Sequence, residues 1–318
     1  MNCLYLDRKN LEISLDGQAL VLYEDSVHKG SVPLHLLERI VMRGNVRLES
    51  RVLAALSVRN IGLLVLSGRN GETIAMLAGR SHNENSRRLG QYRVSLDDDL
   101  RAPLAHWLVL VKVRAQKRLL REALLVRTDL RHALTAAVQR LDNIMNQLRA
   151  DSGVLSLPSL QGFEGAAASA YFGGFTQLFA PSLNFTGRKK RPAPDPVNAC
   201  LSLGYTLLHH DAVHACHIAG LDTMLGLYHE ISFGRESLAC DLMEPLRPLI
   251  DRWVWQLFRD RTLRVEHFSD DSGRCLLSKA GRKHFYAFYE ANSGSARRLL
   301  RRYSHALAKR FQLIHGGE

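Results

Sequence analysis

Residues 11–17, Leu11-Glu12-Ile13-Ser14-Leu15-Asp16-Gly17, decide how the N-terminal part of this chain folds. Apolar and polar residues alternate up to Leu15, which is the period of a strand with one buried face, and Asp16-Gly17 is typical of a hairpin turn. Residues 19–23 are the expected partner strand. Further along, Ile40-Val41-Met42 and the apolar run at residues 62–66 predict two more strands. This part of the chain therefore predicts a small, strand-rich domain.

The hydrophobic period changes after about residue 100, where apolar residues recur at helical spacing. Residues 81–98 are polar with few apolar anchors, so we expect a linker there. Helices are expected at residues 128–150, 161–180, 195–220, 237–260, 276–292 and 295–313. The predicted fold class is α+β, with a β-rich N-terminal domain at residues 1–80 and a larger all-α C-terminal domain at residues 99–318.

The charge of the chain points to a polyanionic partner. It has 43 Lys and Arg against 31 Asp and Glu, a net charge of +12. Residues 271–310 contain ten basic residues and only two acidic ones, and Arg188-Lys189-Lys190-Arg191 forms a second basic run beside prolines. Clustered basic residues favour a surface that binds nucleic-acid phosphates, whereas an evenly spread charge is typical of a solvated surface.

Composition also limits the compartment. The five cysteines are widely spaced and form no CxxC pair, which favours reduced thiols over disulfides or a zinc ribbon. The first residues lack the pattern of a signal peptide, and no stretch has the roughly 20 apolar residues of a membrane span. The expectation is a cytoplasmic protein that does not enter a membrane.

Three segments of the helical part place acidic groups or histidine beside small residues. They contain Glu164, His229, and the pair Asp241 and Glu244. Glu164 has an apolar neighbourhood with no nearby Lys or Arg in sequence, so its burial favours a bound cation. Asp241 and Glu244 share a helix face, where a divalent cation would relieve their repulsion. Such a set is usual for Mg²⁺ or Mn²⁺ in phosphoryl chemistry, but scattered Glu and His are common, so solvated side chains remain the alternative.

A second group of candidate ligands lies on the helix expected at residues 195–220. His210, His214 and His217 have i, i+4, i+7 spacing and could line one face. Zinc would need a fourth ligand, and no Cys or acid stands at a fixed spacing nearby. We interpret these histidines as surface or interface groups, with zinc as the alternative.

Two long runs stand out in the helical part. The first is Asp195-Pro196-Val197-Asn198-Ala199-Cys200-Leu201-Ser202-Leu203-Gly204-Tyr205-Thr206-Leu207-Leu208. The second extends from Gly220-Leu221-Asp222 through Tyr228-His229 to Asp241-Leu242-Met243-Glu244-Pro245. Both runs resemble the signatures of the CRISPR-associated Cas-one family. Lys112 and Gln116 fit the family's Lys-x₃-Gln pattern, and the likeness continues into the N-terminal strands. The resemblance spans nearly the whole chain.

The resemblance implies roles for individual residues. Glu164, His229 and Glu244 would be ligands of Mg²⁺ or Mn²⁺, and Asp241 would be a nearby catalytic acid outside the first set of ligands. Asn198 and Arg235 would brace the site. Beside the basic run, the candidate DNA contacts are Tyr205, Arg235, Arg282 and Lys283.

The resemblance also implies an activity and partners. The family inserts a short protospacer DNA into a CRISPR repeat, with a 3′-hydroxyl of the incoming DNA attacking a phosphodiester. It forms homodimers through the N-terminal domains and works with a small ferredoxin-like companion, the Cas-two protein. Two other functions stay open: a metal-dependent nuclease on branched DNA in repair, and a non-catalytic DNA-bending subunit.

Overall fold

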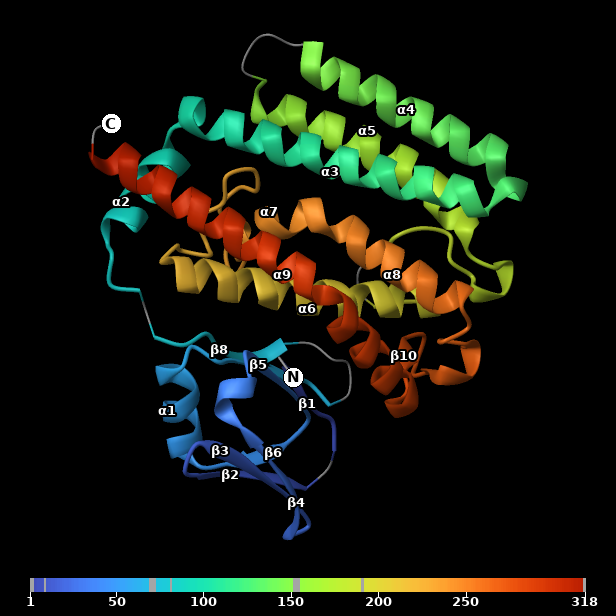
Figure 1. The fold of residues 1–318 in the computed structure, drawn as a ribbon. Helices are drawn as coiled ribbons and strands as arrows, with labels where there is room; N and C mark the ends of the chain where they lie inside the picture. Colours follow the sequence, from blue (N-terminus) through green and yellow to red (C-terminus); the bar gives the residue numbers. More distant parts are fainter. Residues whose placement is uncertain are drawn as a thin grey trace.

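The computed structural model of the protein describes residues 3–8, 10–68, 73–80, 82–150, 155–189 and 192–316. Strands dominate up to residue 77 and helices from residue 86 onward, which confirms the predicted α+β class. Figure 1 shows the strands gathered at one end of the molecule and the helices stacked in layers above them.

Among its described residues, the N-terminal part contains two four-stranded sheets and one α-helix. One sheet has the order β1-β5-β7-β8 and the other β4-β3-β2-β6. Asp16 pairs with Ala19 across the predicted hairpin, and Gly17 adopts a φ of +54°, a conformation that favours glycine. The elements are β1 Cys3–Leu6, β2 Leu11–Asp16, β3 Ala19–Glu24, β4 Val27–Pro33, β5 Arg39–Arg43, β6 Val46–Leu48, α1 Ser50–Val58, β7 Gly62–Leu66 and β8 Thr73–Leu77.

The central strands β5 and β7 of the β1-β5-β7-β8 sheet are buried on both faces, whereas the edge strand β8 is largely exposed. Ile40 and Met42 of β5 point into a core shared with the second sheet and α1. Val41, which lies between them, belongs to the large helical core, as do Leu64 and Leu66 of β7. Successive side chains of a strand point to opposite faces, so one face of this sheet packs against the second sheet and α1, and the other packs against the helices.

The helical part begins earlier than the sequence indicates. Residues 81–98 were expected to be a linker, but α2 occupies Ser86–Leu96 and packs along the C-terminal helix α9, Lys279–Gly316. A Cβ on Gly90 would lie 1.8 Å from the carbonyl oxygen of Phe311, so the close approach of the two helices requires glycine there. The sequence of α2 is polar because the helix buries only a narrow face, made of Gly90, Gln91, Val94 and Ser95.

The remaining helices form two layers, which Figure 1 shows with α3, α4 and α5 on one side and α6 to α9 on the other. Asp97 caps α3 by accepting hydrogen bonds from the backbone N–H groups of Asp99 and Leu100. The helices are α3 Asp98–Val126, α4 Arg131–Ala150, α5 Leu157–Phe175, α6 Pro196–Ala219, α7 Ser237–Met243 and α8 Arg247–Arg259.

Two details of the C-terminal prediction were wrong. The helices expected at residues 276–292 and 295–313 are one continuous helix, α9. Its start is preceded by a small hairpin of β9 Phe268–Asp270 and β10 Cys275–Leu277, so the C-terminal part is not entirely helical. Within the described residues, no helix is both long and apolar enough to span a membrane.

Candidate active site

The carboxylates of Glu164 and Glu244 meet at one lysine. Glu164 comes from α5, and Glu244 lies in a 3-10 turn, Glu244–Leu246, that joins α7 to α8. Lys112 of α3 forms an ion pair with Glu164 and a second one with Glu244, whose Oε2 lies 2.5 Å from its Nζ. Pro245 stands inside that turn, where its missing backbone N–H interrupts the helical hydrogen bonds between α7 and α8.

Glu244 is the more deeply buried of the two acids. Its side chain is 10% exposed, against 25% for Glu164. Burial opposes ionisation of Glu244, but Arg247, whose Nε lies 2.8 Å from Oε1, and Lys112 overcome it and lower the pKa of the carboxyl to about 2. Glu244 is therefore an anion throughout the neutral range.

His229 is held in place by Asp241 of α7. The Asp241 carboxylate, which is fully buried, lies 2.6 Å from His229 Nδ1. It also accepts hydrogen bonds from the backbone N–H groups of Leu227, Tyr228 and His229. A histidine held at Nδ1 presents Nε2 to a ligand, so Asp241 fixes the ring in the orientation that a metal-binding imidazole needs.

The loop that carries His229 is anchored from two other helices. Gln91 of α2 donates to the carbonyl oxygens of Asp222 and Leu225, and its own oxygen accepts from the N–H of Asp222. Arg101 of α3 donates to the Leu227 carbonyl at 3.0 Å. Sequence reasoning missed both residues, because neither stands near a motif and α2 was taken for a linker.

Close packing at Gly226 brings the His229 loop against α7. A Cβ there would lie 2.5 Å from the His229 carbonyl oxygen and 2.7 Å from Ser237 Cβ. Tyr228 packs edge-on to the His229 ring, and its pKa is raised by burial and by the negative charges of Glu164, Glu244 and Asp241. The loop and the two glutamates therefore belong to one site.

The donor types of this site suit a hard divalent cation, although the cage is not preformed. Two carboxylates and an oriented imidazole are the groups that Mg²⁺ or Mn²⁺ accepts. Among the described residues, no three His, Cys, Asp or Glu side chains are grouped as a ready metal site. The position between Glu164 and Glu244 is taken by the Lys112 ammonium, a partner for Glu164 that sequence neighbours did not reveal.

The basic run lies next to the site but is only partly described. Lys190 and Arg191 lie outside the described residues. Arg188 donates to the side-chain oxygen of Asn198 at 2.9 Å and to Ser202, while Lys189 is exposed. Asn198 also accepts from the N–H of Lys189 and donates to the Gly187 carbonyl, so it braces this loop on α6.

Tyr205 packs inside the protein, where its ring is not available to stack on a base. Its hydroxyl donates to Asp251, and two guanidinium groups stack on its ring, with the carbon of Arg188 at 5.3 Å and that of Arg247 at 4.7 Å from the ring centroid. The ring thus connects the basic loop to Arg247 and, through it, to Glu244. The structure corrects the expectation that this side chain contacts DNA.

The other predicted DNA contacts differ in their exposure. Lys283 is exposed on α9, while Arg282 pairs with Asp7 at 2.6 Å. Arg235 donates to the Glu230 carbonyl and to Ser237 and so closes the end of the His229 loop. Of these three residues, only Lys283 is exposed, whereas Arg235 and Arg282 are partly buried.

The three histidines of α6 are interface groups, as expected. His214 bonds the carbonyl of Asn60 and His217 that of Arg80, both at the border with the β-rich part. His210 is buried beside Met76, with burial lowering its pKa to about 3. These contacts account for their spacing without a metal.

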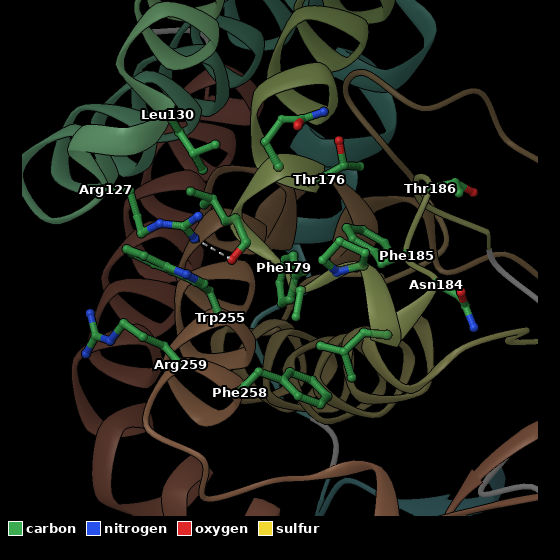
Figure 2. A pocket seen from close by; sticks show the side chains of 15 residues that line it. Arg127, Leu130, Thr176, Phe179, Asn184, Phe185, Thr186, Trp255, Phe258 and Arg259 are labelled. Atoms are coloured by element: carbon green, nitrogen blue, oxygen red, sulfur yellow. Dashed lines mark hydrogen bonds between the residues drawn. The ribbon is translucent and has the colours of Figure 1, made fainter.

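A cavity of about 820 Å³ lies apart from these residues (Figure 2). Aromatic side chains line it, including Phe179, Trp255 and Phe258, and Arg127 at its edge donates to the Leu178 carbonyl. Its lining contains no acidic residue or histidine, so the predicted metal chemistry does not belong there.

Comparison with known proteins shows the family to which this chain belongs. The family model described as CRISPR associated protein Cas1 matches residues 4–291. A CRISPR-associated endonuclease Cas1 of Thermodesulfovibrio yellowstonii is 40% identical over 91% of both chains. A second, from Rhodospirillum rubrum, is 35% identical over 94% of this chain and 88% of its own.

Solved structures share the fold. A CAS1 protein from Thermotoga maritima aligns with a TM-score of 0.84 at 23% identity, over 98% of this chain and 97% of its own. A casposase bound to an integration product aligns with a TM-score of 0.82 at 20% identity, covering 98% of this chain and 91% of that one. On the match of sequence, length and architecture, this chain belongs to the CRISPR-associated Cas1 family.

Proposed function

We propose that the protein is a metal-dependent DNA endonuclease and integrase that inserts short protospacer DNA into a CRISPR array. The observation that carries this proposal is the meeting of Glu164 and Glu244 beside a histidine oriented by Asp241. The names of the relatives, endonucleases of the same family, support nuclease chemistry. The solved casposase complex with an integration product supports strand joining on this fold.

In this proposal Glu164, His229 and Glu244 hold Mg²⁺ or Mn²⁺. When bound, such an ion neutralises charge on the reacting phosphate and activates the attacking oxygen. Asp241 keeps the His229 ring in register, and Arg247 keeps Glu244 ionised and fixed. Attack by a 3′-hydroxyl gives joining, and attack by water gives nicking.

The proposed partners are DNA, a second copy of the chain and a small Cas2 companion. Solved relatives with the fold include a Cas6-RT-Cas1–Cas2 complex and a Cas1–DNA complex. Four apolar side chains of the β-rich part are exposed, and we expect a dimer contact to cover them: Val27, Leu36, Val58 and Ile74. Light scattering of the purified protein tests the dimer.

Strand transfer tests the proposal directly. Purified protein, with and without the Cas2 companion, receives a short duplex with free 3′ ends, a repeat-bearing plasmid and Mn²⁺ or Mg²⁺. We expect metal-dependent joining that is lost in Glu164→Ala and Glu244→Ala, while DNA binding persists. Cutting without joining would favour the repair nuclease, and binding without either would favour a DNA-bending subunit.

A further inference from the structure

Lys112 is shared by the two glutamates proposed as metal ligands. Its ammonium contacts Glu164 Oε1 and Glu244 Oε2 at once, and its side chain is 12% exposed. The three residues come from α3, α5 and the turn after α7, so the lysine ties together separate segments of the helical layers.

This arrangement neutralises the site without a metal. Two carboxylates that approach each other repel strongly in a water-poor setting. Lys112 opposes one charge, and Arg247, at 2.8 Å from Glu244 Oε1, opposes the other. Because these carboxylate oxygens already contact cationic side chains, Glu164 and Glu244 stay close together without a divalent ion, although Lys112 occupies the position between them.

The same contacts exclude a divalent ion from that position. An ion that ligates Glu164 Oε1 and Glu244 Oε2 needs the oxygens that the ammonium occupies, and it carries a like charge. We propose that Lys112 is a positioning residue that holds Glu164 and Glu244 together in the metal-free protein and is displaced when the divalent ion binds. This inference rests on the proposed function, because it assumes that these glutamates take up a metal.

The chain offers a matched control on the same helix. Lys117 of α3 is 14% exposed and pairs with Asp142 of α4, away from both glutamates. Lys112→Met and Lys117→Met each remove one largely buried ammonium, with two ion pairs in the first case and one in the second. Only the first should change the site.

Calorimetric titration of the EDTA-treated full-length protein with Mn²⁺ gives the first readout. We expect Lys112→Met to bind Mn²⁺ at least tenfold more tightly than the unchanged protein, since nothing has to be displaced. Without metal it should melt at a lower temperature, and Mn²⁺ should raise that temperature by more than in the unchanged protein. Lys117→Met should keep the original affinity for Mn²⁺. Equal or weaker Mn²⁺ binding by Lys112→Met overturns the inference.

Displacement itself is visible in protein labelled with ¹⁵N-lysine. The Lys112 ammonium, assigned by its loss in Lys112→Arg, should exchange slowly with water when paired and lose that protection on saturation with Mg²⁺. This experiment needs only the unchanged protein and a charge-conserving variant, so poor folding of Lys112→Met does not prevent it. A protected ammonium that persists at saturating Mg²⁺ overturns the displacement. Absence of metal binding in every variant removes the metal-dependent function as well, whereas binding with Lys112 undisturbed removes only this inference.

Discussion

The carboxylate of Asp241 holds the ring of His229, with 2.6 Å between Oδ1 and Nδ1. The same carboxylate accepts three backbone N–H groups of the loop that carries the histidine. One buried anion therefore orients both the ring and its backbone. His229 lies in a loop, yet these contacts fix its side chain as firmly as if it stood on a helix or strand.

Asp241→Asn should weaken metal binding while leaving the three proposed ligand residues in place. The amide keeps the volume but loses the negative charge and one of its two acceptor oxygens. Loss of a group that orients a ligating histidine typically costs 10–100-fold in metal affinity or activity. We expect a drop of that size in Mn²⁺ affinity by calorimetry and a lower melting temperature. Unchanged affinity would show that the Asp241–His229 contact does not serve metal binding.

Asp251 should make stability depend on pH. Burial raises its pKa from 3.8 to about 6, although the hydroxyls of Tyr205 and Tyr171 and the charges of Arg247 and Arg188 oppose this. A raised folded-state pKa means that the native protein binds this proton more tightly. The stabilisation is complete below about pH 4 and is lost as the pH rises through about 6.

Asp251→Asn mimics the protonated acid and should remove that dependence. Relative to the unchanged protein, its free energy of unfolding should rise between pH 4 and pH 7.5 by about 3 kcal/mol, since one pKa unit corresponds to about 1.4 kcal/mol. Urea unfolding at several pH values measures this difference, with Asp260→Asn on the surface as the control. A difference that stays constant with pH contradicts the prediction.

The contact between the β-rich part and the helices depends on a buried ionic network. Arg39 of β5 pairs with Asp211 of α6 and, at 2.8 Å, with Glu290 of α9. Arg297 binds both acids as well. Breaking a buried ion pair costs about 3–5 kcal/mol because it leaves an unpaired charge.

Asp211→Asn should therefore lower the free energy of unfolding by about 3–5 kcal/mol. Glu38→Gln is the control, because the Glu38–Arg301 pair is exposed and should contribute less than about 1 kcal/mol. Denaturant unfolding compares the two. Similar effects from both substitutions would argue against a structural role for the buried network.

Lys189 should contribute to DNA affinity through phosphate contact alone. Lys189 is exposed, whereas Arg188 also braces its loop through Asn198. Lys189→Gln should weaken DNA binding regardless of sequence and reduce the slope of log K against log salt by about one. Fluorescence anisotropy at several salt concentrations measures the slope, with Lys29→Gln in β4 as the control. An unchanged slope would place Lys189 outside the DNA path.

Several features of the fold and site could be predicted from local sequence. Strand and helix periods separate the two parts of the chain, because burial of one face imposes the period of the element. The Asp16-Gly17 turn and the apolar run at residues 62–66 follow from backbone preference and burial. The family resemblance brought Glu164, His229 and Glu244 forward as metal ligands. The structure brings Glu164 and Glu244 to one lysine, and their role as metal ligands stays a prediction.

Contacts between distant segments were decided only by the tertiary structure. The predicted break at residues 293–294 disappears because Ser293 is fully buried in the packed helix α9, where tertiary contacts outweigh weak helix propensity. Tyr205, expected to meet DNA, is covered by Arg188 and Arg247 instead.

The positions of charged residues can be read from the sequence, but their ion pairs cannot. The sequence determined that basic residues crowd the C-terminal segment. It did not show that Arg282, Arg297 and Arg301 pair with the distant acids Asp7, Asp211 and Glu38. It showed Glu164 without a basic neighbour, while the fold brought Lys112 to it across 52 positions. Local sequence determines the period of each element and the chemistry of its side chains. Which charges neutralise one another depends on how the helices pack, and only the folded chain fixes that.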